Sequence, residues 1–183
     1  QKLLQGAAAG DLPDIIVLDN PDHQAFASLG VLEDITDKVT EWGEGGTYFQ
    51  GPWDSTVFQE KNYGLPDNSN CLVLWTNDDL MAAKSVGTPT TWDGVTTAVT
   101  GVSEGDVYGL AVSGVKSEEG TFQGLPFLWA TGADIPTIDS DGGKKALQLW
   151  TYYVSSGWMS KSILNWKQSD VLGQFENGKA VMM

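Results

Sequence analysis

Residues 63–80 read YGLPDNSNCLVLWTNDDL, and they combine the local signals of a turn, a strand and a helix start. Tyr63-Gly64-Leu65-Pro66 has the composition of a turn, and the polar residues Asp67 to Asn70 follow it. The apolar run Leu72-Val73-Leu74-Trp75 predicts a buried strand, and Asn77-Asp78-Asp79-Leu80 predicts a helix start. A short polar loop beside a rigid strand is typical of the edge of a ligand cleft.

Helix and strand signals alternate along the rest of the chain. The apolar runs Ile15 to Leu18 and Val107 to Val112 predict buried strands. Helices are predicted before Gly10, over residues 22–29 before Gly30, from a cap at Asp141, and from Ser169 or Asp170 to Gly178. This alternation predicts an α/β fold with largely parallel sheets.

The charge balance limits the kinds of partner. The chain has 183 residues, with 24 acidic residues against 10 basic ones, and its net charge is -14. Nucleic acids and anionic membranes are bound by basic surfaces, so neither is expected as a partner. All the basic residues are lysines, so the planar guanidinium fork that grips carboxylate or phosphate is absent from the sequence. A neutral ligand therefore fits the composition better than an anionic one.

Metal and membrane signals are weak. Cys71 is the only cysteine and His23 the only histidine, so neither a cysteine-based metal site nor a histidine cluster can be assembled from this sequence. We expect no cofactor and no metal, and we expect Cys71 to be a small buried residue beside the apolar run. No stretch approaches the ~18 apolar residues of a membrane span. Gln1-Lys2-Leu3-Leu4 does not read as a signal peptide, so any targeting segment is expected to lie outside this sequence.

Several motifs, taken in order, carry a family resemblance. They are the segments from Asp14 to Ile16, Asn20 to His23 and Gly30 to Thr36, the stretch from Tyr63 to Leu80, Thr90-Thr91-Trp92-Asp93, and the end from Phe175 to Met183. With them the chain resembles the extracellular solute-binding proteins that serve sugar importers of the ATP-binding-cassette (ABC) type, the maltose-binding-protein-like family. The family's chains are longer, so the sequence is interpreted as a fragment.

The resemblance implies a periplasmic-binding-protein-like fold, in which hinge strands join two α/β lobes around a ligand cleft. Residues 1–74 would belong to the N-terminal lobe up to the first hinge strand, and residues 75–183 to the C-terminal lobe. The implied protein is an extracytoplasmic monomer, periplasmic or a cell-surface lipoprotein. It would bind a neutral sugar or oligosaccharide and deliver it to the membrane permease of an ABC importer.

Two other functions remain open. A peptide or another small solute could bind to the same fold. A glycoside hydrolase fits less well, because the adjacent Glu118 and Glu119 are poorly placed to flank a glycosidic bond at the separations of ~5 Å or ~6.5–9.5 Å that such enzymes use. We therefore expect a binding protein and not an enzyme.

The expected ligand contacts lie in loops that follow strands, where open α/β sheets bind ligands. The first loop offers Asn20, Asp22 and His23, although Asp19 or Asp22 could instead cap the next helix. The second offers Asn68 and Asn70, whose amides both donate and accept hydrogen bonds, although such residues also form plain turns.

The family resemblance adds contacts from the second lobe. It implies Glu119, Phe122 and Gln123 in the loop after the strand from Val107 to Val112, with Phe122 as an aromatic platform. Trp166 is flanked by polar residues and is a further candidate platform. The tryptophans at 75, 92, 129 and 150 are expected to pack in the core.

Overall fold

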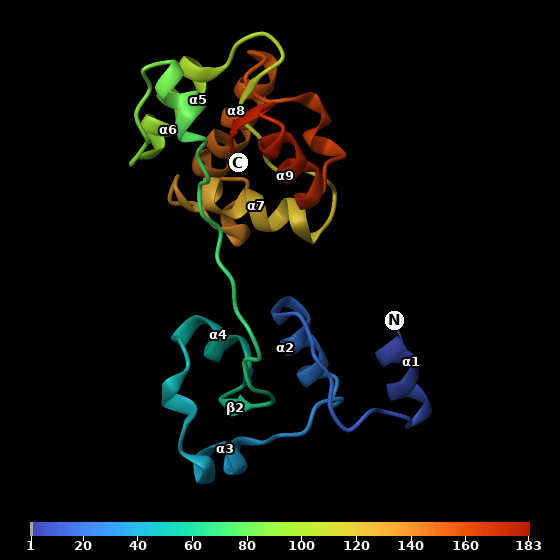
Figure 1. The fold of residues 1–183 in the computed structure, drawn as a ribbon. Coiled ribbons are helices and arrows are strands. Elements are labelled where there is room, and N and C mark those ends of the chain that lie inside the picture. The colour runs from blue at the N-terminus through green and yellow to red at the C-terminus, as the bar shows by residue number, and fades with distance from the viewer. Residues whose placement is uncertain (1) are drawn as a thin grey trace. The chain divides into compact units, whose positions relative to one another are not determined.

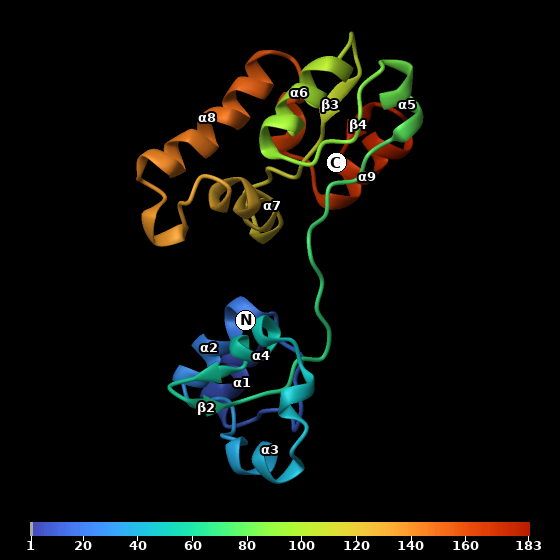
Figure 2. The ribbon, with the colours of Figure 1, turned by 90° about the vertical axis from the view of Figure 1, so that its left-hand side faces the viewer.

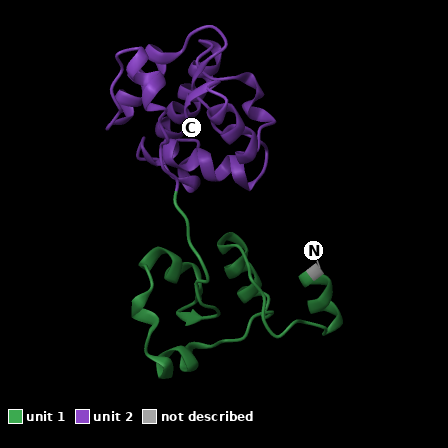
Figure 3. Ribbon diagram, viewed as in Figure 1, with its two compact units in different colours: residues 1–71 green, residues 72–183 purple. Residues whose placement is uncertain are grey.

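The computed structural model describes residues 2–183, which form two compact units (Figure 3). Unit 1 comprises residues 1–71 and unit 2 comprises residues 72–183. The assignment of two lobes that meet at residues 74 and 75 stays a prediction. We describe each unit by itself.

Unit 1 is mostly helical, with one small hairpin (Figure 1). Its elements are α1 (Lys2–Ala9), α2 (Asn20–Ser28), α3 (Thr36–Trp42), η1 (Gly45–Thr47), α4 (Gln50–Ser55), β1 (Val57–Phe58) and β2 (Lys61–Asn62). The strands β1 and β2 pair antiparallel. Helix α2 packs against α4 and β1, and α3 contacts β2.

The predicted strand from Ile15 to Leu18 is wrong. These residues have no regular structure, and Ile15 and Val17 are 87% and 77% exposed. A strand needs a neighbour to pair with its backbone, and none of the described residues pairs with this run. The apolar composition alone was therefore not enough to predict burial.

Unit 2 contains the larger core. Its elements are α5 (Asp78–Ala83), α6 (Trp92–Val102), β3 (Tyr108–Leu110), α7 (Glu118–Trp129), η2 (Ile135–Thr137), α8 (Asp141–Ser155), η3 (Lys161–Leu164), α9 (Gln168–Glu176) and β4 (Ala180–Met182). Helix α6 packs against β3 and α9 packs against β4, so the sheet lies between them (Figure 2).

The sheet of unit 2 is partly parallel. Strands β3 and β4 pair in parallel, with Tyr108 opposite Ala180, so the strand predicted over residues 107–112 is confirmed in a shorter form. Trp75 pairs antiparallel with Met183, its N–H lying 2.9 Å from the Met183 carbonyl oxygen. The prediction of a buried strand over Leu72 to Trp75 is wrong, because only the end of the run finds a partner. Val73 is 58% exposed and Trp75 is 59% exposed.

Several predicted helix ends are confirmed. The side chain of Asn77 accepts a hydrogen bond from the Leu80 N–H at the start of α5. Gly10, Gly30 and Gly178 follow α1, α2 and α9 with left-handed backbones. The cap predicted at Asp141 is instead Ser140, whose hydroxyl accepts from the Gly143 N–H.

The largest core cluster of unit 2 surrounds Tyr153. Its ring is fully buried among Met81, Val99 and Met159, and its hydroxyl lies 2.6 Å from the Thr96 hydroxyl. Burial raises the pKa of the Tyr153 phenol, so the side chain stays neutral. Cys71 is exposed, contrary to the prediction, because it precedes the packed part of unit 2.

Candidate functional site

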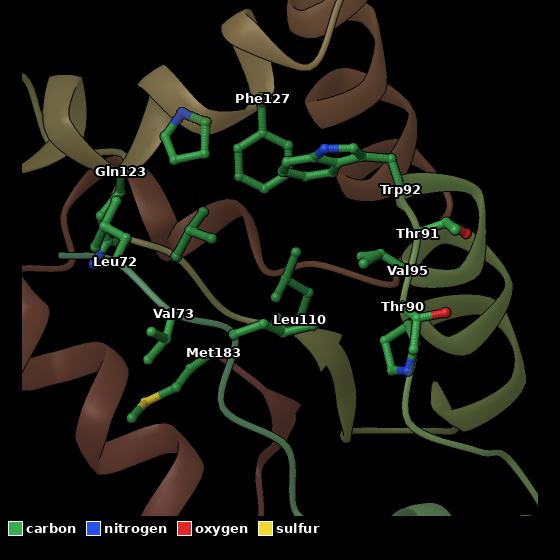
Figure 4. A pocket seen from close by; sticks show the side chains of 14 residues that line it. Leu72, Val73, Thr90, Thr91, Trp92, Val95, Leu110, Gln123, Phe127 and Met183 are labelled. Atoms are coloured by element: carbon green, nitrogen blue, oxygen red, sulfur yellow. The ribbon is translucent and has the colours of Figure 1, made fainter.

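A pocket of unit 2 has a volume of about 380 Å³ (Figure 4). Its walls come from the segment before α5, the segment that leads into α6, the end of β3, one side of α7 and the residue after β4. The lining residues are Leu72, Val73, Leu74, Pro89, Thr90, Thr91, Trp92, Val95, Leu110, Val112, Gln123, Pro126, Phe127 and Met183.

Trp92 is the largest side chain of the pocket and begins α6. The hydroxyl of Thr91 accepts a hydrogen bond from the Gly94 N–H at 3.0 Å and so caps this helix. The indole is 43% exposed. The cap fixes the first turn of α6, and with it the position of an aromatic face at the pocket.

Phe127 connects Trp92 to the core. The ring centroids of Trp92 and Phe127 lie 5.0 Å apart at 55°, and Phe127 meets the Trp150 ring edge-on at 5.3 Å and 89°. Trp150 packs against the core cluster, and its buried indole nitrogen has no hydrogen-bond partner among the described residues. This aromatic row holds the Trp92 ring in place from the interior of unit 2.

The polar groups of the pocket are few and uncharged. Gln123 supplies an amide, whereas the hydroxyls of Thr90 and Thr91 point away from the middle of the pocket (Figure 4), and the described lining residues include no ionisable side chain. The Gln123 Oε1 atom accepts a hydrogen bond from the Ser113 N–H at 2.5 Å, which leaves the Nε2 group to donate. A mainly apolar pocket with an aromatic face and a few neutral polar groups can hold a neutral ligand that has apolar faces and hydroxyl groups.

Gln123 is the one predicted contact that lines this pocket. Residues 118–129 form α7, so the loop predicted there is wrong. Phe122 is half-buried on that helix and does not line the pocket. The Glu119 Oε2 atom accepts a hydrogen bond from the Gln168 N–H at 2.9 Å, so this carboxylate binds the start of α9. The positions of Phe122 and Glu119 are thus set by α7, and not by a loop.

The predicted contacts of unit 1 fall into two groups. Asn20 and Asp22 are exposed in the first turn of α2. Of the two cap candidates, Asp19 occupies the N-cap position and Asp22 does not, and no side-chain cap hydrogen bond forms there. Asn68 and Asn70 are exposed in the segment that follows β2. All four side chains are open to solvent, and their contact with a ligand stays a prediction.

Trp166 lies between η3 and α9 and packs against two core clusters of unit 2. Its backbone carbonyl accepts a hydrogen bond from the Ser113 hydroxyl at 2.8 Å. The polar neighbours in the sequence suggested an open loop, but the short turn η3 directs the indole inward. Trp166 is half-buried and packs against the core here, and its role as an aromatic platform stays a prediction.

His23 is buried, with 9% of its surface exposed, and its contact with a ligand stays a prediction. A Cβ atom added at Gly64 would lie 2.7 Å from the His23 Nε2 atom, so the ring packs closely against the segment after β2. Burial lowers the pKa of His23, and a hydrogen bond with the Tyr63 backbone opposes this in part. The neutral imidazole is thus part of the packing of unit 1.

This burial predicts a pH dependence for unit 1. Below about pH 6.5, the usual histidine pKa, His23 takes up a proton in the unfolded chain more readily than in the folded one. The free energy of unfolding therefore decreases as the pH is lowered. The slope contributed by one such group is at most about 1.4 kcal/mol per pH unit. The urea midpoint of unit 1, followed by hydrogen exchange of the α2 amides, should decrease when the pH is lowered from about 7.5 to about 5.5. The decrease should be smaller in His23→Gln.

Asp34 does not interfere in this window, because its hydrogen bond with Lys61 lowers its pKa to about 2. An equal loss of stability on acidification in wild type and His23→Gln would contradict the role given to His23.

The sequence reading missed Trp92 and Phe127 as pocket residues. Thr90-Thr91-Trp92-Asp93 is one of the segments that carry the family resemblance, but Trp92 was predicted to pack in the core because tryptophans are usually buried. Its position at a capped helix start was the available signal. Phe127 gave no signal of its own, because it lies in the apolar run 125–128.

No group of three or more histidine, cysteine, aspartate or glutamate side chains that could hold a metal ion occurs among residues 2–183. Across the same residues, no helix is both long enough and apolar enough to cross a membrane.

Comparison with known proteins defines the class. The family model of bacterial extracellular solute-binding proteins matches residues 1–183, so the chain belongs to that family. A binding protein of Brucella abortus (strain 2308) is 22% identical over all of this chain, which covers 46% of that protein. The chain thus spans about half the length of the curated relatives it matches.

Solved structures agree with this assignment. An ABC transporter solute-binding protein from Thermotoga lettingae, bound with alpha-D-tagatose, superposes with a TM-score of 0.84 at 25% identity, over 99% of this chain and 50% of that chain. The sugar-binding protein MalE from Xanthomonas citri gives 0.79 at 24% identity, over 99% and 48%. The periplasmic-binding-protein-like α/β fold is therefore confirmed, as part of a longer architecture.

Proposed function

We propose that unit 2 binds a neutral sugar or oligosaccharide in the pocket between α6 and α7. The observation that supports this is the partly exposed ring of Trp92 in the same pocket as the uncharged amide of Gln123. An indole face packs on the C–H face of a sugar ring, while hydroxyl and amide groups bond its hydroxyls. The sugars bound by similar proteins, alpha-D-tagatose and maltose, have this chemistry.

In the whole protein, this binding would serve delivery to the membrane permease of an ABC importer. We propose an extracytoplasmic monomer, tethered as a lipoprotein or free in the periplasm, without enzymatic activity. The family's description as extracellular solute-binding proteins supports this placement. Asn20, Asp22, Asn68 and Asn70 of unit 1 remain proposed contacts, because their side chains are exposed.

Replacing Trp92 tests this function. Isothermal titration of the chain with maltose and with D-tagatose is expected to show saturable binding to at least one of them. Trp92→Ala should weaken it about 10-fold or more, because lost stacking and lost apolar contact together cost more than about 1.4 kcal/mol.

Trp129→Ala is the matched control. Trp129 is also an exposed tryptophan of unit 2, at 55%, but it binds Asp134 and does not line the pocket. Its replacement should leave the sugar affinity unchanged. Equal losses in both variants, or saturation only with a short peptide, would overturn the sugar assignment.

A further inference from the structure

Unit 1 has a hollow of its own, of about 360 Å³, between α3 and α4. Its walls include the Tyr48 and Trp53 rings, and the three glycines that also line it, Gly43, Gly45 and Gly46, contribute no side chain. None of the ligand contacts expected from the sequence lies in it. A volume in this range is typical of small-molecule sites.

The aromatic wall is well ordered by its contacts. Tyr48 and Trp53 are stacked, with centroids 5.7 Å apart at 27°, and Trp42 tilts against Tyr48 at 6.4 Å. A Cβ atom added at Gly45 would lie 2.8 Å from the end of the Trp53 indole, so the ring rests on this glycine. Phe49, at the start of α4, is 82% exposed and adds apolar surface next to Tyr48.

The polar groups of the hollow are placed to accept hydrogen bonds. The Gln50 Nε2 group donates to the Asp54 Oδ1 atom at 2.6 Å, which leaves the Gln50 carbonyl oxygen free to accept. The Thr40 hydroxyl donates to the Thr36 carbonyl at 2.9 Å and keeps its own lone pairs. Ligand hydroxyl groups are the matching donors.

The charge of the hollow narrows the ligand class further. The described residues that line it include no acidic or basic side chain, so neither a cation nor an anion finds a counter-charge in its wall. Aromatic faces together with neutral acceptors favour a ligand that has both apolar C–H surface and hydroxyl groups.

We propose that this hollow is a second saccharide site, which binds one neutral sugar ring against Tyr48 and Trp53, with Gln50 and Thr40 accepting from its hydroxyls. The site lies within unit 1 and is separate from the pocket of unit 2. Its ligand class follows from its own residues, so the proposal stands or falls independently of sugar binding at Trp92.

The test is a titration of the whole chain with glucose and with maltose, followed by the indole N–H resonances in NMR spectra. The Trp53 resonance is expected to shift saturably. Gln50→Ala removes an acceptor and should weaken the response of Trp53 about 2- to 10-fold, the range expected for one hydrogen bond. Gly45→Ala pushes the Trp53 ring from its place and should weaken the response as well.

Gln24→Ala is the matched control, because Gln24 is another exposed glutamine of unit 1 with one hydrogen bond, to the Val57 carbonyl, and does not line the hollow. It should leave the Trp53 response unchanged. A silent Trp53 resonance would overturn the second site, and a response of Trp92 in the same spectra would leave the proposed function intact. A Trp53 shift that survives both Gln50→Ala and Gly45→Ala unchanged would also overturn the proposal.

Discussion

Replacing Tyr153 by alanine is expected to lower the free energy of unfolding of unit 2 by about 3–5 kcal/mol. Tyr153 has 0% exposure and is first among the fully buried side chains by volume, so its removal leaves a cavity at the centre of the main core cluster. The neighbours Met81 and Met159 are themselves almost fully buried, at 2% and 1% exposure, which limits collapse into the space.

Tyr153→Phe separates the packing from the hydrogen bond. It keeps the ring and removes only the 2.6 Å contact with the Thr96 hydroxyl, which should cost about 0.5–1.5 kcal/mol. Urea denaturation followed by circular dichroism measures both variants. If alanine proved no more destabilising than phenylalanine, the ring would not be the centre of this core.

The second large effect concerns two glycines in helices of unit 2. A Cβ atom added at Gly143, in the first turn of α8, would lie 1.9 Å from the Ile138 carbonyl oxygen. Since that obstacle is backbone, Gly143→Ala should destabilise the unit by about 1–3 kcal/mol or more. A Cβ atom at Gly124, inside α7, meets nothing within 4 Å. Gly124→Ala should therefore stabilise by about 0.5–1 kcal/mol through its helix propensity.

Thermal or urea unfolding of the two variants should thus move in opposite directions. An unchanged stability of Gly143→Ala would show that the Ile138 carbonyl lies farther from α8 than described. Destabilisation at Gly124 would mean that this face of α7 is covered.

Local signals predicted the helix ends well. Asn77, Gly30 and Gly178 have the expected capping or left-handed roles, because these depend on residues next to them in the chain. The strands were harder to predict, since pairing depends on distant segments. Ile15 to Leu18 and Leu72 to Trp75 have strand composition, but Ile15 and Val73 are exposed where no paired neighbour covers them.

The candidate site shows the same division. Gln123 was predicted from the family resemblance, and it does line the pocket. Trp92 was predicted to pack in the core and Phe127 was given no role, because the sequence alone does not tell which aromatic side chain of a packed row reaches the surface. His23 was placed in an open loop, but α2 begins at Asn20 and turns its ring inward against Gly64.

Sugar binding in the pocket of unit 2 is tested most directly by NMR titration of the whole chain with maltose and D-tagatose. We predict saturable shifts of the Trp92 indole N–H and the Gln123 side-chain amide, while the Trp129 indole, outside the pocket, stays fixed. Unchanged Trp92 and Gln123 resonances with every neutral sugar, or shifts that appear only with a charged peptide, would contradict the proposed function.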